Sequence, residues 1–218
     1  MTAYVLVTGT DTGVGKTVAT AVLALRHQRT GRRVTVVKPV QTGVAAGEPG
    51  DAAVVAHLAG ADAHEYVRLP EPLAPHQAAA RAGVSLPGVD TCARRISDVD
   101  ADVVLVEGAG GVTVALDDVG GTLLELGRAL TGYGDVQVVV VCRSGLGTLN
   151  HTQLTVQAVR AAGLPVAGLV IGSWPEPAPL VDRLNREDLP RVTGAPLLAV
   201  LPAGLGQAAP SYVRGTDW

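Results

Sequence analysis

Short runs of apolar residues recur along the chain, separated by longer segments with helical spacing. The runs are rich in Val and Leu and do not alternate with polar residues, which is typical of strands buried on both faces of a parallel sheet. We expect six such strands, at residues 4–7, 34–37, 103–106, 136–141, 166–171 and 197–201.

Between these runs, apolar residues recur mostly three or four positions apart, as on one face of an α-helix. Examples are Val18, Val22 and Leu25; Val54, Val55 and Leu58; and Leu149, Leu154 and Val156 through Val159. Alternating strand and helix patterns favour βαβ units. We therefore predict an α/β fold: a single domain, residues 1–218, with a doubly wound, mainly parallel sheet flanked by helices. The proline-rich segment 69–76 is interpreted as a surface loop and not a domain boundary, because strand and helix patterns continue to alternate after it.

Composition narrows the functional classes. With 47% hydrophobic and 17% charged residues, the 218-residue chain can build a full core, and a net charge of −3 provides no basic stripe for nucleic acid. No apolar stretch reaches the roughly 18 residues of a membrane span. Cys92 and Cys142 lack C-x-x-C spacing, which favours reduced core thiols and a cytoplasmic protein.

Polar or glycine-rich segments follow four of the predicted strands. They are TGTDTGVGKT (8–17), KPVQTG (38–43), EGAGG (107–111) and RSGLGTLNH (143–151). In open parallel sheets, ligands bind outside the carboxyl ends of the strands. We therefore expect the four segments to meet at one edge of the sheet and to form a ligand site there.

The first segment is a candidate phosphate-binding loop. Gly9 and Gly15 enclose five residues, one more than the common P-loop pattern allows. Gly13 and Gly15 let backbone N–H groups point inward toward a phosphate at the start of a helix, where Lys16 would reach the terminal phosphates. Thr17 would offer its hydroxyl to Mg²⁺. The alternative is a glycine-rich turn in which Thr17 is a helix N-cap.

Two carboxylates are candidate magnesium ligands. Glu107 ends a buried apolar run, where a ligand opposite a phosphate loop belongs, although a solvated strand end is the alternative. Asp51 precedes an amphipathic helix and is either a second metal ligand or the N-cap of that helix.

The chain has 17 basic residues, of which only Lys16 and Lys38 are lysines. A compact ammonium at Lys38, after a strand and before a proline, would bind a carboxylate or carbamate and offset charge during phosphoryl transfer. Thr42 could donate to the same ligand or belong to an ordinary polar turn.

Together these segments resemble the dethiobiotin synthetase family, of the P-loop NTPase type. The family's phosphate loop, G-T-[DG]-T-x-V-G-K-T, has the same extra residue, and K-P-V, V-E-G-A-G-G and L-G-x-x-N-H follow later in the chain. In this sequence they stand at residues 9–17, 38–40, 106–111 and 146–151. The resemblance covers nearly the whole chain and weakens toward its C-terminus.

The resemblance implies a homodimeric ligase of biotin biosynthesis. It would make dethiobiotin from 7,8-diaminononanoate, CO₂ and a nucleoside triphosphate with Mg²⁺, through a carbamate and a carbamic-phosphoric anhydride. By similarity, the catalytic residues are Lys16, Lys38 and Thr12, and the metal ligands are Thr17, Asp51 and Glu107. The substrate residues are Thr42, Gly110, Gly111 and, across the dimer interface, Asn150, which could also be a helix N-cap. The nucleotide residues are Gly13, Val14, Gly15, Lys16, Thr17, Val18, Gly172, Ser173, Pro202, Ala203 and Gly204.

One departure concerns the nucleotide base. Many family members carry an Asn-Asp pair where this chain has Gly172 and Ser173, so base recognition would shift to backbone groups of residues 202–204. The nucleotide is therefore ATP or another nucleoside triphosphate such as CTP. A regulatory or partitioning P-loop ATPase is a rival interpretation, but such proteins often carry an extra lysine early in the loop, where this chain has Thr10, Asp11 and Thr12. Another amide- or carbamate-forming ligase of the same fold is the second rival.

Overall fold

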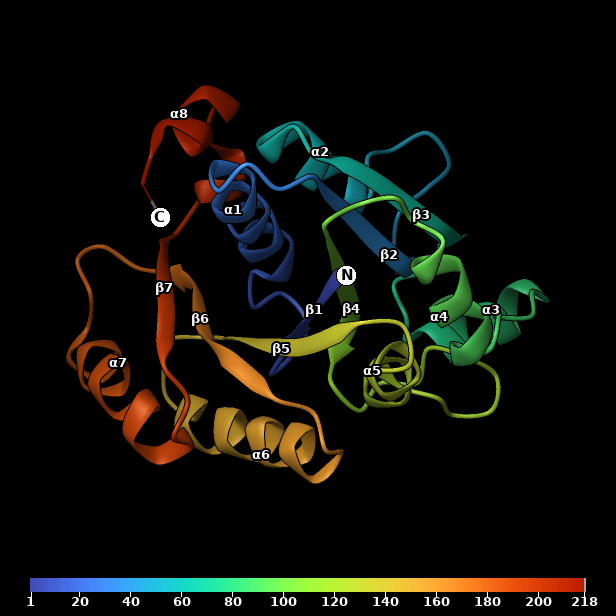
Figure 1. Ribbon diagram of the computed structural model, residues 1–218. Coiled ribbons are helices and arrows are strands. Elements are labelled where there is room, and N and C mark those ends of the chain that lie inside the picture. The colour runs from blue at the N-terminus through green and yellow to red at the C-terminus, as the bar shows by residue number, and fades with distance from the viewer. Residues whose placement is uncertain (218) are drawn as a thin grey trace.

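The computed structural model describes residues 1–217 and contains one parallel sheet of seven strands in the order β3-β2-β4-β1-β5-β6-β7 (Figure 1). The strands are β1 Ala3–Gly9, β2 Val34–Thr42, β3 Asp62–Leu69, β4 Val103–Gly111, β5 Asp135–Cys142, β6 Val166–Trp174 and β7 Leu197–Pro202. The helices are α1 Lys16–Arg29, α2 Asp51–Ala59, α3 Pro75–Ala82, α4 Val89–Ser97, α5 Leu123–Leu130, α6 Thr148–Ala161, α7 Leu180–Thr193 and α8 Pro210–Gly215, with a short 3₁₀ helix, η1, at Leu205–Gln207. The predicted α/β class is confirmed.

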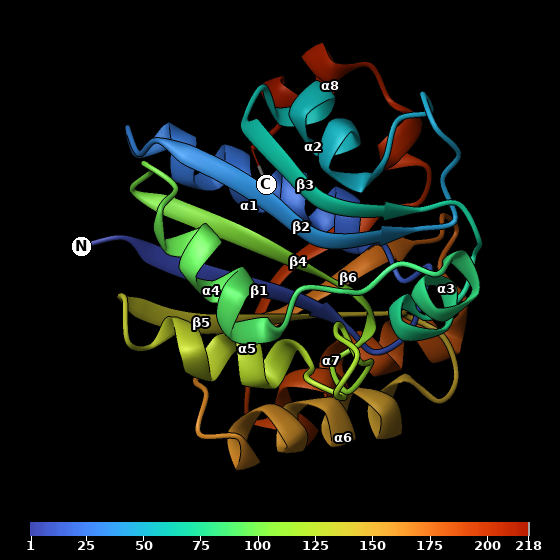
Figure 2. The same ribbon diagram turned by 90° about the vertical axis from the view of Figure 1, so that its right-hand side faces the viewer.

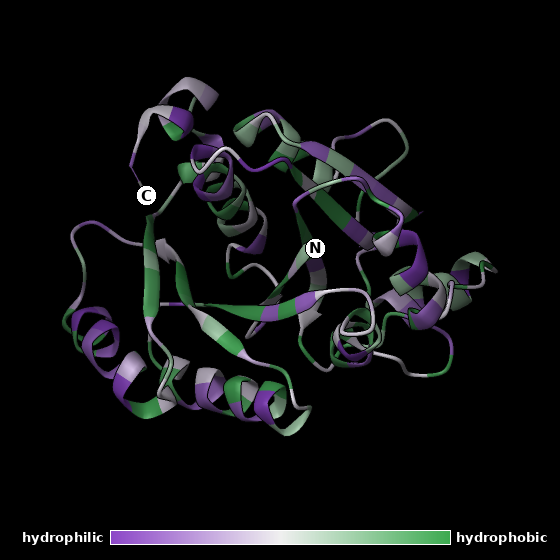
Figure 3. Ribbon diagram, viewed as in Figure 1, coloured by the Kyte–Doolittle hydropathy of each residue, from purple (hydrophilic) through white to green (hydrophobic). Residues whose placement is uncertain are grey.

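Helices cover both faces of the sheet (Figures 1 and 2). Successive side chains of a strand point to opposite faces, and in β1 Val5 and Val7 join the core beneath α1 and α2, whereas Tyr4 and Leu6 join the core beneath α4, α5, α6 and α7. Apolar residues dominate the central strands (Figure 3). This two-sided burial explains why the strand runs do not alternate in sequence.

The six expected strands are present, and a seventh, β3, was not predicted. Its sequence DAHEYVRL has no apolar run, and β3 lies partly buried at one edge of the sheet, where polar side chains are tolerated; β7 at the other edge is also partly buried but apolar. Strands β2 and β4 also extend beyond their apolar runs, so Lys38 and Glu107 lie within strands rather than after them. The reason is continued pairing: Lys38 pairs with β3 and Glu107 with β1.

Glycines occupy the N-cap positions of three helices near the carboxyl ends of the strands. They are Gly15 for α1, Gly50 for α2 and Gly147 for α6. The N-cap alternatives for Thr17, Asp51 and Asn150 are therefore wrong. A glycine suits α1 and α6 because the caps there have a left-handed backbone, and the three polar side chains remain free for other contacts.

Two further sequence features have structural outcomes. Cys92 and Cys142 are buried and unpaired, as expected of core thiols. Within residues 1–217, no helix has the length and apolarity to cross a membrane.

Candidate active site

The segment between β1 and α1 folds as a tight loop whose glycines are sterically required. Gly13 and Gly15 have left-handed backbones, with φ of 73° and 95°. A Cβ on Gly15 would lie 2.5 Å from the carbonyl oxygen of Gly172 on β6. The Lys16 ammonium bends back over the loop and donates to the carbonyl of Asp11 at 3.0 Å. The loop therefore surrounds a lysine at the N-terminus of α1, an arrangement suited to binding phosphate.

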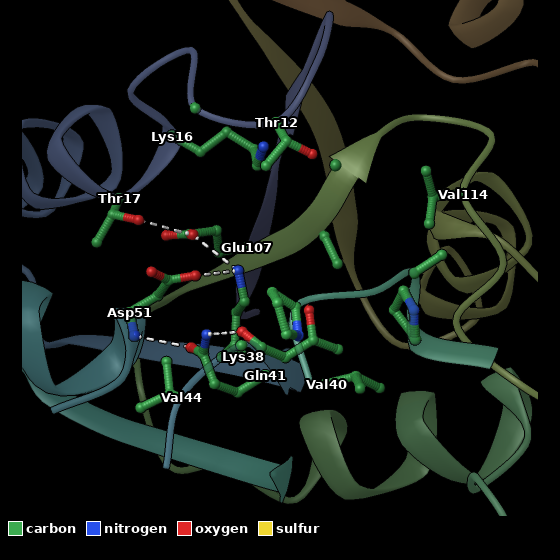
Figure 4. A pocket seen from close by; sticks show the side chains of 18 of the residues that line it. Thr12, Lys16, Thr17, Lys38, Val40, Gln41, Val44, Asp51, Glu107 and Val114 are labelled. Atoms are coloured by element: carbon green, nitrogen blue, oxygen red, sulfur yellow. Dashed lines mark hydrogen bonds and ion pairs between the residues drawn. The ribbon is translucent and has the colours of Figure 1, made fainter. Parts of the chain in front are cut away.

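Beside this loop, the Lys38 ammonium links two carboxylates (Figure 4). Its Nζ lies 2.6 Å from Asp51 Oδ2, 2.9 Å from Glu107 Oε1 and 3.0 Å from the Gly108 carbonyl oxygen. All three ammonium protons therefore have acceptors. Lys38 and Glu107 are buried, whereas the Asp51 side chain is 34% exposed, so the cluster extends from the interior to the solvent-accessible edge of the site.

Two hydroxyls of α1 complete the surroundings of Glu107. Thr17 donates to Glu107 Oε1 at 3.1 Å. The hydroxyl of Thr20 lies 3.0 Å from Glu107 Oε2 and 2.9 Å from the Lys16 carbonyl oxygen, so its single proton serves one acceptor at a time. Thr20 was missed in the sequence, where it is one more residue of a helix. Its only sequence signal is its position, one helical turn after Lys16.

The two lysines have opposite pKa shifts. Burial lowers the pKa of Lys16, and the neighbouring charge of Lys38 lowers it further. Burial also acts to lower the pKa of Lys38, but Glu107 and Asp51 outweigh it, so the pKa of Lys38 is raised. Burial acts to raise the pKa of Asp51, but the Lys38 ammonium outweighs burial and lowers that pKa. These shifts favour the charged forms of Lys38 and Asp51.

A pocket of about 790 Å³ opens next to this cluster. Eleven of the predicted site residues line it: Thr12, Gly13, Gly15, Lys16, Thr17, Val18, Lys38, Thr42, Asp51, Glu107 and Gly110. They come from three of the four polar segments, from Val18 in α1 and from the start of α2. The expected meeting of these segments at one edge of the sheet is therefore observed.

The other predicted site residues lie outside the pocket lining: Val14, Gly111, Asn150, Gly172, Ser173, Pro202, Ala203 and Gly204. The fourth polar segment also contributes nothing to the lining. It contacts the phosphate loop instead, where Arg143 forms an ion pair with Asp11. Asn150 is exposed on α6.

Gly172 is packed tightly against the phosphate loop. A Cβ at this position would lie 2.1 Å from the carbonyl oxygen of Val14, so this backbone leaves no space for a side chain. Across the same region, the amide of Ala203 donates to the carbonyl of Trp174 at 2.9 Å and is already engaged within the protein.

The pocket also has a wall that sequence reasoning did not assign to a site. Pro72, Leu73, Ala74 and Pro75, from the segment interpreted as a surface loop, line it together with Val40 and Val114. The segment is a connection between β3 and α3, but it also covers one side of the pocket. The prolines of this segment give it a rigid apolar surface, and they were the sequence feature that could have indicated a pocket wall.

Comparison with known proteins agrees with this geometry. Residues 3–208 match a family described as an AAA domain. The ATP-dependent dethiobiotin synthetase BioD of Rhodococcus jostii (strain RHA1) is 51% identical over 210 residues, covering 94% of this chain and 88% of that protein. The protein of the same name from Saccharopolyspora erythraea is 53% identical over 202 residues, 91% of this chain and 87% of that protein. The chain belongs to the dethiobiotin synthetase family. Membership confirms the resemblance seen in the four polar segments and makes the chain one of a family of ATP-dependent enzymes.

Solved structures share the fold of this dethiobiotin synthetase family member at low identity. The septum site-determining protein MinD of Pyrococcus horikoshii OT3, complexed with Mg-ADP, aligns with a TM-score of 0.55 and 19% identity over 99% of this chain and 90% of that chain. A complex of a Cyanothece McdA variant with ATP aligns with a TM-score of 0.57 and 13% identity, over 98% and 88%. At these identities the likeness establishes a P-loop NTPase fold and nothing about partners.

Proposed function

We propose that this protein is a dethiobiotin synthetase whose activity resides in one P-loop α/β domain, residues 1–218. It would join 7,8-diaminononanoate and CO₂ at the expense of a nucleoside triphosphate. The observation that carries the proposal is the buried Lys38 ammonium between Asp51 and Glu107, beside a phosphate loop and a pocket in a chain of this family.

The phosphate loop would hold the triphosphate. Backbone N–H groups of residues 13–18 and the N-terminus of α1 favour phosphate oxygens. Lys16 now bonds to the Asp11 carbonyl within the loop and would exchange that acceptor for a phosphate oxygen. Thr12 lines the pocket and would donate its hydroxyl to a phosphate or to the substrate.

The donor set fits Mg²⁺. Thr17, Asp51 and Glu107 offer oxygen ligands, which Mg²⁺ prefers, and within residues 1–217 no group of three or more His, Cys, Asp or Glu forms a protein cage for a metal. Mg²⁺ is commonly bound by one or two carboxylates, with water and substrate phosphates completing its shell. When bound, the ion would supply charge neutralisation between phosphate groups.

The reacting nucleophile would come from the substrate. One amine of the diamine adds to CO₂ to give a carbamate, whose oxygen attacks the γ-phosphorus and displaces the nucleoside diphosphate. The second amine then attacks the carbamate carbon, releases phosphate and closes the ureido ring. The protein would contribute position and positive charge, and Lys38 would exchange one of its present acceptors for an oxygen of the carbamate or the transferring phosphoryl group.

The substrate would lie along the wall opposite the phosphate loop. Thr42 lines the pocket there, whereas Gly110, which precedes Gly111, lines the pocket beside the phosphate loop. The apolar surface of residues 72–75 suits the alkyl chain of a diamine acid. This placement leaves the amines near Lys38 and directs the carboxylate end away from the phosphates.

The active assembly would be a homodimer in which Asn150 reaches the carboxylate end of the partner's substrate. Asn150 is exposed on α6 between Leu146 and Leu154, which are 87% and 56% exposed. Asn150 and Leu154, four residues apart, lie on one face of the helix, and Leu146 lies just before its N-cap, Gly147. An exposed apolar face of this kind is typical of a contact surface between proteins.

The nucleotide would be ATP, as in the relatives' names, or another nucleoside triphosphate such as CTP. The crowding at Gly172 supports the view that no side chain there reads the base. Ser173 and residues 202–204 would then form the surroundings of the base. The two buried free thiols support a reducing, cytoplasmic location.

A phosphate-release assay tests the proposal. Purified protein with bicarbonate, Mg²⁺ and nucleotide should release phosphate only when diaminononanoate is added, and product mass should match dethiobiotin. Equal phosphate release without the diamine would instead indicate a nucleotide switch of the partitioning ATPase class. Replacing ATP by CTP, GTP or UTP in the same assay measures base preference.

A further inference from the structure

The loop before Asp51, residues 43–50, has little packing of its own. It joins β2 to α2, and most of its residues are exposed. Asp51 nevertheless reaches the buried Lys38 ammonium at 2.6 Å. Some other part of the protein must therefore hold this loop, because exposed loops without packing partners open readily.

Arg68, on the edge strand β3, binds the loop directly. Its Nη1 donates to the carbonyl oxygens of Ala45 at 3.1 Å and Glu48 at 2.6 Å. Its Nε and Nη2 donate to the two carboxylate oxygens of Glu65 at 2.6 and 2.9 Å. The bidentate pair fixes the plane of the guanidinium, so Glu65 directs Arg68 toward the loop carbonyls.

Gln41 connects the same region to the N-terminus of α2. Its Oε1 accepts the Asp51 N–H at 2.8 Å (Figure 4), which satisfies one of the free N–H groups of the first helical turn. The site is tightly packed around Gly50, where a Cβ would lie 2.5 Å from Glu65 Oε2, 2.9 Å from Arg68 Nη2 and 3.0 Å from Gln41 Oε1. The three side chains therefore converge on the residue that precedes Asp51.

We propose that Arg68, directed by Glu65, is a positioning residue for the active site. It holds loop 43–50 and, together with Gln41, fixes the Asp51 carboxylate at Lys38. If Asp51 binds the divalent cation, as proposed above, Arg68 also sets the affinity of the site for that cation. This last step rests on the proposed function. Arg68 itself touches neither nucleotide nor substrate.

The first test uses the protein without metal or nucleotide. In Arg68→Ala, hydrogen–deuterium exchange should accelerate in residues 43–53 and stay unchanged in α6 and β5. The matched control is Arg33→Ala. Arg33 directly precedes β2, far from loop 43–50, and its guanidinium forms a bidentate ion pair with Asp100 at 2.9 and 3.0 Å. Unchanged exchange of residues 43–53 in Arg68→Ala would overturn the proposal.

The second test measures the cation itself. Mn²⁺ binding in the presence of a non-hydrolysable nucleotide, followed by electron paramagnetic resonance, should weaken about tenfold in Arg68→Ala, as for other groups that orient metal ligands. Arg68→Lys should restore little, because one ammonium cannot satisfy Glu65 and two carbonyls in a plane. Gln41→Met, which removes the acceptor of the Asp51 N–H and also the Nε2 donor to the Thr42 carbonyl oxygen, should move exchange and Mn²⁺ binding in the same direction.

These readouts separate the positioning role from the proposed function. The proposed role of Arg68 would be contradicted if Arg68→Ala and Gln41→Met bound Mn²⁺ with the same affinity as Arg33→Ala. The proposed function would be contradicted if the wild-type protein bound Mn²⁺ and nucleotide but made no dethiobiotin. In that case hydrogen–deuterium exchange of residues 43–53 would still test the role of Arg68.

Discussion

The two lysines of the chain both lie in the candidate active site, and every other basic residue is an arginine. The geometry explains the choice at Lys38. Its three acceptors belong to Asp51, Glu107 and Gly108, and the surrounding space is buried. A compact ammonium with three rotatable donors meets these acceptors, whereas a planar guanidinium needs a wider, flat arrangement.

Lys38→Arg should therefore lower kcat by more than about tenfold. The larger group would have to displace Asp51 or Glu107 and so move that carboxylate from its position near the phosphate loop. Steady-state kinetics with saturating nucleotide measure the effect. Near-normal turnover would show that any cation suffices at this position.

Thr20→Val should destabilise the protein by about 1–3 kcal/mol, because it leaves a buried carboxylate oxygen of Glu107 without a donor while keeping side-chain volume. Thr155→Val is the matched control. Within residues 1–217, the Thr155 hydroxyl bonds only to the carbonyl four residues before it, whereas the Thr20 hydroxyl has the corresponding Lys16 carbonyl and also Glu107 as acceptors. Urea unfolding of both variants compares the two losses, and equal losses would mean that Glu107 gains nothing from Thr20.

Site residues differ in how far sequence predicts them. Lys16, Thr17 and Glu107 belong to local patterns whose chemistry is recognisable without a fold. Gln41 and Arg68 have no such pattern, because their contacts depend on how loop 43–50 closes over β2 and β3. Long-range closure of this kind is set by packing and leaves no periodic signal in the sequence.

At the level of elements, the buried strands and the apolar edge strand β7 were predictable, and the polar edge strand β3 was not. A central strand has apolar residues on both faces, as in β5, whereas β3 has partly exposed polar and charged residues such as His64 and Glu65. The carboxyl ends of strands were also underestimated. Ladder pairing continues through Lys38 and Thr42 although the apolar run stops at Val37, since hydrogen bonds between strands do not depend on side-chain polarity.

The C-terminal segment stabilises α2 from the end opposite to Asp51. Arg214, in α8, donates to the carbonyl oxygens of Leu58 at 3.0 Å and His57 at 2.8 Å. These carbonyls belong to the last helical turn, where acceptors lack partners within the helix, and a cation there also interacts favourably with the helix dipole. The short helix α8 is therefore a cap for the helix that carries Asp51.

Arg214→Ala should lower the free energy of unfolding by about 1 kcal/mol. Arg191→Ala provides the comparison, because Arg191 forms an exposed ion pair with Asp188, and such pairs contribute little. Chemical denaturation curves of both variants, fitted with one common m-value, give the two changes in the free energy of unfolding. Identical midpoints for the two would indicate that α8 does not cap α2.

At the level of the whole molecule, strand order decides which polar segments share the pocket. Strands β2, β4 and β1 are consecutive neighbours, so the segments at their carboxyl ends line one cavity. β5 lies on the other side of β1, and its following segment meets the back of the phosphate loop through Arg143 and Asp11. Sequence alone places all four segments at one edge but does not order the strands along it.

The proposed homodimer can be tested through the exposed face of α6. If α6 is the contact surface, Leu154→Asp should convert the dimer to a monomer, because a charge replaces an exposed apolar side chain on the same helix face as Asn150. Tyr212→Asp on α8, at the side of the molecule opposite α6 (Figures 1 and 2), should leave the dimer intact. Sedimentation velocity distinguishes the two variants, and a wild-type monomer with full activity would contradict the dimer.

Subunit mixing tests whether the dimer completes the active site. Lys38→Arg and Asn150→Ala should each be nearly inactive alone. In a mixed dimer, one site would combine an intact Lys38 with the partner's intact Asn150, because each subunit of a two-fold dimer contributes the same surface to the other. Random mixing of equal amounts should then recover about a quarter of the wild-type activity. If Asn150 serves its own subunit instead, no mixed site is intact and mixing recovers nothing.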